Sequence, residues 1–553
     1  MSGVTAPLTS LAPRLRDEPG LTRALADPSA RLAVVEVARP AALAALAHLS
    51  NRRPLVVACP TGTMAEQLHD DLRQFVDPAD VAFFPGWETL PFERVSPNVE
   101  TMGQRLEVLW RLRDPERCPR IVVAGVRSLL QKLGPHAMEL DPIVVRPGTE
   151  IDPDALVEQL VRFGYRREGL VEHRGEFSRR GAIIDVFPAA GDTPIRIDLW
   201  GDEVDRLTNF AVNDQRSTSD LDEATVFPAR ELIPADDVRE RARGLIASEP
   251  WGREQWERLA EGAHFDGMES WLPWLVVDDV LITDVLPDAA KIVLIEPRRM
   301  RDRAADLIAE EDDLARTLAS TWARDPDKTF PRLHADPDAL LARLGGSFWS
   351  IDSTPESPDI PVVEAMGWGP VVGDGSGLTD RLAELIADGY SVVVAADGEG
   401  SARRLHALLL DHGLDFTVRV GDRSPAADDE VPPGGSIVVA PLHRGVTLPK
   451  ARVAVVAESD LTGRRRAHRR ARPRKRSDTA STFEDLKTGN YVVHHQHGVG
   501  QFEGMVKRAI GGVERDYLLL SYKGGDKLYI PVSYTHLRAH ETGSGISYAV
   551  FCL

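Results

Sequence analysis

The sequence predicts a multidomain α/β protein with a β-rich insert in its first domain and a small β-barrel near its end. Three observations lead to this fold class. Apolar strand patterns alternate with amphipathic helices in two separate stretches, which is typical of parallel sheets. Short strands with polar–apolar alternation interrupt the first of these stretches. After residue 483, short strands recur about every ten residues with glycine turns between them, as in small barrels.

The composition limits the protein classes that fit. The chain has 553 residues and a formal net charge of −19. This length predicts three or four domains, and the charge excludes a protein that coats nucleic acid with its whole surface. Cys59, Cys118 and Cys552 lie far apart without CxxC spacing, so neither a disulfide framework nor a zinc site is predicted. Without a signal-peptide pattern or an apolar run of ~18 residues, we expect a cytoplasmic protein with no membrane partner.

Residues 1–133 are predicted to form the first part of a helicase-like α/β domain. The strand Leu55–Ala58 leads through Thr61–Thr63 into the helix Ala65–Phe75, which is the layout of a phosphate-binding loop. A nucleotide-binding loop of this kind needs several glycines, a lysine for the phosphates and a Ser or Thr for magnesium. This loop has one glycine and no lysine, so we expect no ATP hydrolysis and no bound cofactor there.

Residues 134–217 are predicted to form the inserted small domain. In the strand Ile195–Trp200, alternation puts Arg196, Asp198 and Trp200 on the face opposite the apolar residues. Trp200 could cover a second layer of core or serve as an exposed anchor for another protein. Arginines crowd the region: Arg166, Arg167, Arg174, Arg179, Arg180 and Arg196. A local positive field in an acidic chain favours the anchor, with an acidic protein surface or a nucleic-acid backbone as partner.

The chain then returns to α/β character. The second part of the first domain is predicted over residues 218–349, with a strand over Lys291–Ile295 and a long helix over Arg299–Ala319. A second α/β domain of unknown role is predicted over 360–458, with strands such as Ser391–Ala396. The first domain is therefore expected to be one α/β domain that the insert interrupts.

Residues 463–482 are predicted to be a basic linker. The segment Gly463–Arg476 holds nine basic residues and no acidic one. Such a block is usually a solvated linker, and the alternative is a salt-sensitive contact with a nucleic-acid backbone. The candidate DNA contacts are Arg464, Arg465, Arg466, Arg469 and Arg470.

Residues 483–532 are predicted to form a small barrel of SH3 or Tudor size. His494, His495 and His497 suggest a metal site, but no cysteine or carboxylate completes a ligand set, so no metal is expected. From Ser533 to Leu553 the strand alternation is lost. We interpret this stretch as a non-native tail, which leaves the barrel incomplete with an open sheet edge.

Several long motifs of the sequence resemble those of known protein families. EFSRRGAIIDVFP and PIRIDLWGDEVDRL resemble the small domain shared by the excinuclease B subunit and the transcription-repair coupling factors. FFPGWETLPFERVSP and DYLLLSYKGGDKLYIPV resemble the transcription-repair coupling factor family specifically. The similarity spans about residues 30 to 532.

The resemblance implies two partner sites. The family's small domain recruits the excinuclease A subunit, and the corresponding candidates are Arg174, Arg179, Arg180, Arg196 and Trp200. The family's barrel binds the RNA polymerase β subunit by strand addition, and the candidates are Met505, Val506, Lys507, Arg508, Ile510, Leu518, Leu519, Leu520 and Tyr522. Replacing Arg180 and Arg196 together by alanine is expected to abolish capture of the excinuclease A subunit with a nearly unchanged melting temperature.

The resemblance also implies an adaptor in transcription-coupled nucleotide excision repair. The family's ATP-dependent DNA translocase motor, with its ATP, magnesium and DNA, would lie beyond residue 532. This chain is therefore expected to bind partners without moving along DNA. The alternative is a helicase-like ATPase or a DNA-binding protein that acts through the basic linker.

Overall fold

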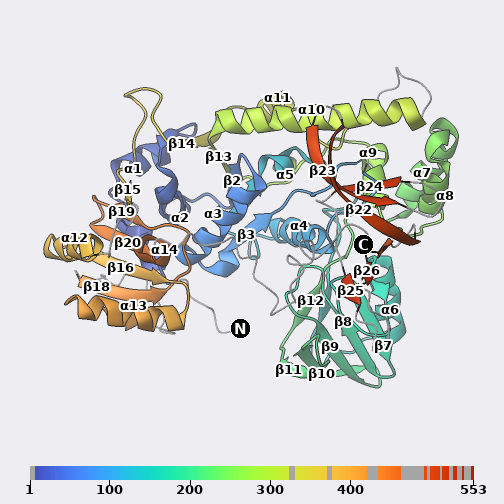
Figure 1. Cartoon of the computed structure of the whole chain (residues 1–553), viewed down its shortest axis with the longest axis horizontal. Helices are drawn as coiled ribbons and strands as arrows, with labels where there is room; N and C mark the ends of the chain where they lie inside the picture. Colours follow the sequence, from blue (N-terminus) through green and yellow to red (C-terminus); the bar gives the residue numbers. More distant parts are fainter. Residues whose placement is uncertain are drawn as a thin grey trace. The chain divides into compact units, whose positions relative to one another are not determined.

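The structure is a computed structural model that consists of two compact units, residues 1–465 and 466–553 (Figure 1). The residues that it describes are 7–91, 93–322, 330–369, 376–419, 434–462, 491–494, 498–510, 513–521, 527–531, 538–540 and 550–552. Among the helices of these residues, none has the length and apolarity needed to cross a bilayer.

The first unit is built on a six-stranded sheet in which every pairing is parallel. Its order is β1-β14-β13-β2-β4-β3, from β1 (Arg31–Ala33), β2 (Leu55–Cys59), β3 (Val81–Phe84), β4 (Ile121–Gly125), β13 (Lys291–Ile295) and β14 (Phe348–Asp352). Strands from before and after the insert share this sheet. The accompanying helices are α1 (Pro19–Ala26), α2 (Arg39–Leu49), α3 (Gly62–Phe75), α4 (Val99–Leu112), α5 (Val126–Leu130), α10 (Pro297–Trp322) and α11 (Pro337–Arg343).

Both faces of this sheet are covered, which explains its uninterrupted apolar strands. All five residues of β2 are buried. Leu55, Val57 and Cys59 join the core on one face, whereas Val56 and Ala58 join the core on the other. A tryptophan-rich helical region follows the insert and comprises α7 (Asp236–Ser248), α8 (Arg253–Ala260) and α9 (Leu272–Leu275). Its packing includes an edge-to-face contact between Trp256 and Trp271 with ring centroids 4.7 Å apart.

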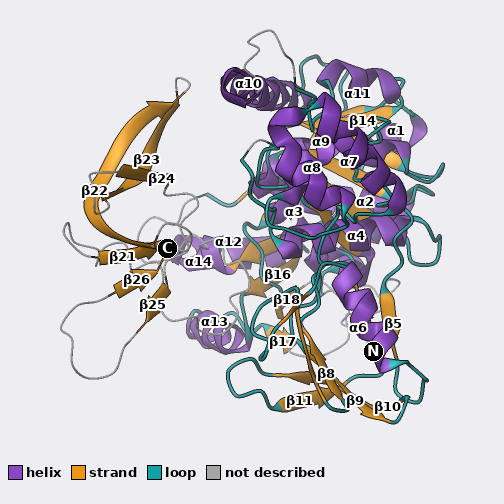
Figure 2. Ribbon diagram, turned by 90° about the vertical axis from the view of Figure 1, so that its right-hand side faces the viewer, coloured by secondary structure: helices purple, strands orange, loops and turns teal. Residues whose placement is uncertain are grey.

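The insert is a meander of six strands in sequential order, antiparallel except for its first pair. The helix α6 (Pro153–Arg162) shares a core with one face of the sheet, beside which it lies in Figure 1 and Figure 2. A two-stranded ribbon, β5 (Ile143–Val145) paired with β12 (Ala224–Val226), brings the chain in and out. The meander comprises β6 (Arg166–Arg167), β7 (Glu176–Arg180), β8 (Ile183–Val186), β9 (Ile195–Trp200), β10 (Glu203–Phe210) and β11 (Ser217–Asp220).

The insert is packed tightly against α4. A Cβ added at Gly103 of α4 would lie 2.6 Å from the Cβ of Ala189 and 2.7 Å from its carbonyl carbon. The insert's exit is also fixed, because Glu231 forms a fully buried ion pair with Arg105 of α4. Arg230 beside it pairs with the buried carboxylate of Glu269. Close helix contact and buried charge pairs thus hold the insert on the first domain.

A second α/β layer follows residue 360. Its sheet has the order β15-β19-β20-β16-β18-β17, with parallel pairings from β20 to β17 and antiparallel ones at the other end. The strands β15, β19 and β20 are not predicted from the sequence. The strands are β15 (Met366–Gly367), β16 (Ser391–Ala396), β17 (Thr417–Arg419), β18 (Gly434–Val439), β19 (Val446–Leu448) and β20 (Val453–Ala457), and the helices are α12 (Ser376–Ala387), α13 (Glu399–Asp411) and α14 (Glu458–Thr462).

This second sheet shares a core with the first domain. Val393 and Ala395 of β16 belong to the same buried cluster as the apolar residues of α2 and α3. Val392 and Val394 face the other way and pack with α12 and α13. His443 donates its backbone N–H to the Asp71 carboxylate of α3 at 2.9 Å. The two sheets are therefore joined by apolar packing and by a partly buried polar contact.

The second unit contains a sheet of order β24-β23-β22-β21-β26-β25. The predicted strands are present as β21 (Tyr491–His494), β22 (Gly498–Ile510), β23 (Val513–Ser521) and β24 (Lys527–Pro531). Two short strands, β25 (Arg538–His540) and β26 (Val550–Cys552), fall within the predicted tail, and β26 pairs with β21. Among the described strands β24 and β25 end the order, so a closed barrel stays a prediction.

Candidate protein-interaction site on the inserted sheet

The candidate site lies on the face of β7, β8 and β9 that points away from α6. Antiparallel pairing puts Ser178, Asp185 and Arg196 in one cross-strand row, and Arg180, Ile183 and Asp198 in the next. On β9, the three apolar residues of the other face are buried in the insert's core. The alternation expected for this strand is therefore present.

Trp200 ends β9 and is 82% exposed, the most exposed large hydrophobic side chain in the described part of the chain. The strand turns directly after it at Gly201, whose φ of 65° favours glycine. Trp200 does not cover a second layer of core, so the buried alternative for this residue is wrong. An indole left in water on a hairpin is suited to protein binding.

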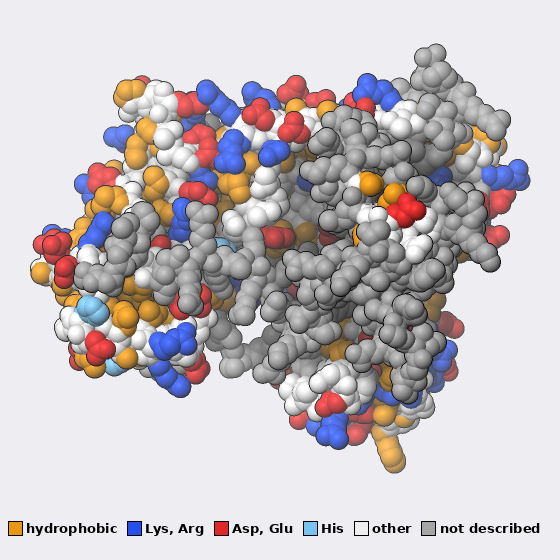
Figure 3. Space-filling model, in the orientation of Figure 1, with side chains coloured by type: hydrophobic (Ala, Val, Ile, Leu, Met, Phe, Trp, Pro, Cys, Tyr) orange, Lys and Arg blue, Asp and Glu red, His pale blue; other side chains and the backbone are white. Residues whose placement is uncertain are grey.

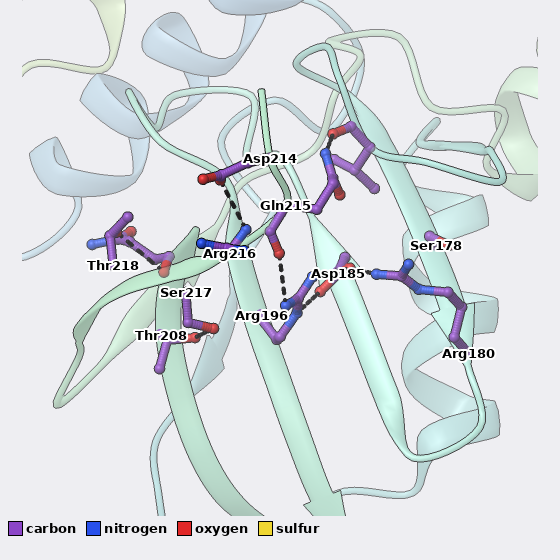
Figure 4. A network of polar contacts seen from close by, with 12 residues as sticks. Ser178, Arg180, Asp185, Arg196, Thr208, Asp214, Gln215, Arg216, Ser217 and Thr218 are labelled. Carbon is purple, nitrogen blue, oxygen red and sulfur yellow. Dashed lines mark hydrogen bonds and ion pairs between the residues drawn. The ribbon is translucent and has the colours of Figure 1, made fainter. Parts of the chain in front are cut away.

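Arg196 has a different environment from the tryptophan four residues later. Its side chain is only 14% exposed, and it binds the Asp185 carboxylate through two hydrogen bonds, Nε to Oδ1 at 2.7 Å and a terminal nitrogen to Oδ2 at 2.9 Å. These hydrogen bonds raise the pKa of Arg196. Its other terminal nitrogen donates to the Gln215 carbonyl at 3.0 Å (Figure 4), and its guanidinium lies over the Phe210 ring.

Asp185 is the residue that the sequence reading missed. It is 1% exposed and also accepts a hydrogen bond from Arg180, whose side chain is 46% exposed. Two arginines therefore share one buried carboxylate (Figure 4). The signal was present in the sequence as an acidic residue within the apolar strand Ile183–Val186, because a buried carboxylate requires a partner.

The predicted local positive field is largely neutralised. Five of the six arginines have a carboxylate partner within the described residues: Arg166 with Glu176, Arg174 with Asp192 and Glu100, Arg179 with Asp154, and Arg180 and Arg196 with Asp185. Arg174 lies where the insert meets α4, since Glu100 belongs to that helix. Over the described surface of Figure 3, basic and acidic side chains are interspersed. The expectation of a cationic patch is therefore wrong for these five residues.

The expected effect of the double alanine replacement also needs correction. Removing Arg180 and Arg196 would leave Asp185 buried without either ion-pair partner. Breaking a buried pair from one side typically costs ~3–5 kcal/mol. The melting temperature should fall, so loss of capture by this variant could not be assigned to the interface alone.

Comparisons with known proteins agree with this architecture. Residues 143–232 match the family model described as the UvrB interaction domain, and residues 486–539 match that of the CarD-like/TRCF RID domain. A transcription-repair-coupling factor of Mycobacterium bovis is 34% identical over 529 residues, covering 88% of this chain and 42% of the relative. Those of Myxococcus xanthus and Escherichia coli are 30% and 28% identical, covering 88% and 90% of this chain and 43% and 44% of the relatives.

The resemblance to the transcription-repair coupling factor family is confirmed. The chain spans less than half the length of these relatives. The matched interaction domain contains the whole inserted sheet with Asp185 and Trp200.

The candidate polymerase-binding residues lie in the second unit, where residues 486–539 match the CarD-like/TRCF RID domain. Met505, Val506, Lys507, Arg508 and Ile510 lie on β22, and Leu518, Leu519 and Leu520 on β23. Each of these β23 residues pairs with both β22 and β24. By contrast, β21 pairs β22 only from Gly498 to Gln501. Within the described strands, one backbone edge of Met505–Ile510 is thus open, whereas Leu518–Leu520 cannot accept another strand.

Three groups of candidates lie elsewhere. Tyr522 and the arginines 464–470 lie outside the described residues. Of the predicted loop Thr61–Thr63, only Thr61 lies between β2 and α3, because α3 begins at Gly62; the Thr61 hydroxyl oxygen caps the helix by accepting from the Met64 N–H at 3.2 Å. A Cβ added at Gly125 would lie 3.2 Å from the Gly62 nitrogen, so the end of β4 lies against this loop.

Proposed function

We propose that this chain is an adaptor of transcription-coupled nucleotide excision repair. In this proposal the inserted sheet recruits the excinuclease A subunit, and the second unit contacts the RNA polymerase β subunit. The observation that carries the proposal is the exposure of Trp200 on a domain that matches the UvrB interaction domain. Trp200 supplies the apolar anchor, and the half-exposed Arg180 supplies a hydrogen-bonding cation on the same face.

The polymerase contact is proposed for the open edge of β22. A partner strand that pairs with Met505–Ile510 would gain backbone hydrogen bonds without displacing a described strand. We propose that the sheet curls into a small barrel of SH3 or Tudor size, which the match to the CarD-like/TRCF RID domain supports. Leu519 is buried and would stabilise that sheet instead of meeting the partner.

No nucleotide takes part in these contacts under this proposal. The Thr61–Thr63 loop lacks a lysine, and its threonine hydroxyl already caps α3. Any contact with DNA is assigned to the basic segment at 464–470. The proposal gives this chain no part in ATP-driven translocation.

Replacing Trp200 by alanine tests the proposal. Because the side chain is 82% exposed, the free energy of unfolding should stay within ~0.5 kcal/mol of the original value. Loss of an aromatic anchor should weaken binding of the purified excinuclease A subunit by ~2 kcal/mol, or about 30-fold. Titration calorimetry measures the affinity, and urea denaturation measures the stability.

Val277→Ala is the matched control, because Val277 is 75% exposed but lies in the first domain. This control should bind like the unmodified chain. Equal affinities of the Trp200 and Val277 variants would reject the proposed recruitment surface.

A further inference from the structure

The two arginines of the candidate site, Arg180 and Arg196, differ in how many of their side-chain nitrogens already have a hydrogen-bond acceptor. Arg196 uses Nε and both terminal nitrogens, toward the two Asp185 oxygens and the Gln215 carbonyl. Arg180 has an assigned acceptor for one terminal nitrogen only, within the described residues. The Arg196 side chain is 14% exposed and that of Arg180 is 46% exposed. Arg180 can therefore meet a partner directly, whereas Arg196 has little left to offer.

We propose that Asp185 is a positioning residue of the recruitment surface, and that Arg196 acts through it without touching the partner. This inference rests on the proposed function of the inserted sheet. Asp185 is 1% exposed and holds Arg180 from below by a charge-assisted hydrogen bond. The guanidinium of Arg180 is thus fixed before binding, which lowers the entropic cost of association.

Arg196 also holds the segment 211–217 over the sheet. Gln215 has a φ of 59°, which is uncommon for a residue with a side chain. Its carbonyl accepts from Arg196, and its amide donates to the carbonyls of Val171 and Val212 at 3.2 and 2.9 Å. Arg196 is thus one of several groups that hold this loop in place. Beneath it the row of Ser178, Asp185 and Thr208 stays buried.

The geometry also relates this buried pair to Trp200. Arg180 pairs with Ile183, and Ile183 pairs with Asp198 of β9. Asp198 lies two residues before Trp200 on the same face of the strand. Strand spacing puts the Cα atoms of Arg180 and Trp200 roughly 12 Å apart, within the footprint of one protein partner. Rotation of Arg180 would therefore change the same binding surface that Trp200 anchors.

A double-mutant cycle on the full chain tests this role. Arg196→Met leaves Asp185 buried with one ion-pair partner fewer, and should weaken binding of the excinuclease A subunit at least tenfold. It should also increase hydrogen exchange in the segment 211–217. Asp185→Asn removes the carboxylate that holds Arg180, so it should also weaken binding about tenfold, and the Asp185→Asn/Arg196→Met pair should bind about as weakly as either single variant because both residues act through Arg180. Arg180→Met should weaken binding about tenfold when residue 185 is Asp, and less than threefold further when it is Asn.

Two results would overturn the inference. The first is a double variant in which the two losses add, tenfold upon tenfold, because Arg196 would then touch the partner independently of Asp185. The second is normal binding by Arg196→Met with a released segment. If Arg196→Met does not fold, Arg196→Lys replaces it in the cycle, and the same two results decide.

Failure of the proposed function would look different. If the Trp200→Ala variant binds like the unmodified chain, the recruitment surface is wrong. The exchange measurement still decides the positioning role, because Arg196→Met either releases the segment 211–217, as we expect, or leaves it protected, which contradicts the role. The two proposals can therefore fail separately.

Discussion

At the scale of single residues, buried charges carry much of the specificity of this protein. Arg105 and Glu231 are both 0% exposed and pair at 2.7 Å. Glu231 also accepts from the Trp87 indole nitrogen at 3.0 Å. A buried ion pair adds little net stability, because both charges lose their hydration, but removing one partner is strongly destabilising. Such pairs therefore fix one arrangement of the chain by making alternatives costly.

Replacing Arg105 by methionine should lower the free energy of unfolding by ~3–5 kcal/mol, because it leaves the Glu231 carboxylate buried without its cation. Urea denaturation followed by circular dichroism measures the change. Arg253→Met is the control, since the Arg253–Glu257 pair lies on an exposed helix surface and should change stability little. Similar losses in the two variants would contradict the role assigned to burial.

Acid should destabilise the fold through His264. Burial, and then the nearby charge of Arg230, lower the pKa of this imidazole to about 4, well below the usual ~6.5 of an unfolded chain. The unfolded state therefore takes up the proton first. As the pH falls from 6.5 toward 4, stability should drop by up to ~1.4 kcal/mol per pH unit. Urea denaturation between pH 7 and 4.5 measures the slope.

His264→Gln should remove this contribution, so the slope of stability against pH should fall by up to ~1.4 kcal/mol per pH unit. His136 provides the opposite case, because hydrogen bonds to Glu139 and Asp237 raise its pKa. Its contribution is fully present below pH ~6.5 and is lost as the pH rises through the raised value. His136→Asn should therefore lower stability by a constant amount below pH ~6.5 and leave the slope in acid unchanged. An unchanged slope in His264→Gln would show that this histidine is not the acid-sensitive group.

At the scale of elements, the contact between α4 and the insert has no spare volume. Ala189 occupies the space in which a side chain at position 103 would lie. Close approach of this kind needs glycine because any Cβ would overlap the neighbouring chain. The glycine therefore sets the distance between the helix and the inserted domain.

Gly103→Val should separate α4 from the insert or destabilise the fold by several kcal/mol, since the overlap is with backbone and cannot be relieved by a rotamer change. Thermal unfolding and hydrogen exchange of residues 186–192 measure the effect. Gly244→Ala on α7 is the control, because nothing lies within 4 Å of an added Cβ there. This control should stabilise the helix by up to ~1 kcal/mol. Equal behaviour of the two variants would refute the close contact.

The sequence was sufficient where a pattern is local. The buried strand β2 shows as an apolar run, and β9 shows as strict alternation. The partners of Asp185 and Glu231 were not predictable, because ion pairs form between residues that the fold brings together, such as Arg105 and Glu231, 126 positions apart. The arginines therefore looked like a free cationic patch. In the structure, Arg180 differs from Arg196 in side-chain exposure, which the count of arginines in the sequence does not reveal.

At the scale of the first unit, the all-parallel sheet and the mixed second sheet share one apolar core. This predicts that the 360–458 region unfolds together with the first domain. Under native-state hydrogen exchange, peptides from β16 should show the same opening free energy as peptides from β2. A lower value for β16 by several kcal/mol would mean that the second sheet unfolds alone and that the shared core does not couple them.

The ribbon of β5 and β12 has a practical consequence. Val145 pairs with Ala224 and Ile143 with Val226, so the chain leaves the domain beside the point where it enters. The buried residues of the insert's own core all fall between Ile143 and Ala229. A segment whose two ends lie side by side can be excised at a single pair of adjacent splice points, but its contacts with Gly103 and Arg105 of α4 would have to be rebuilt in any host.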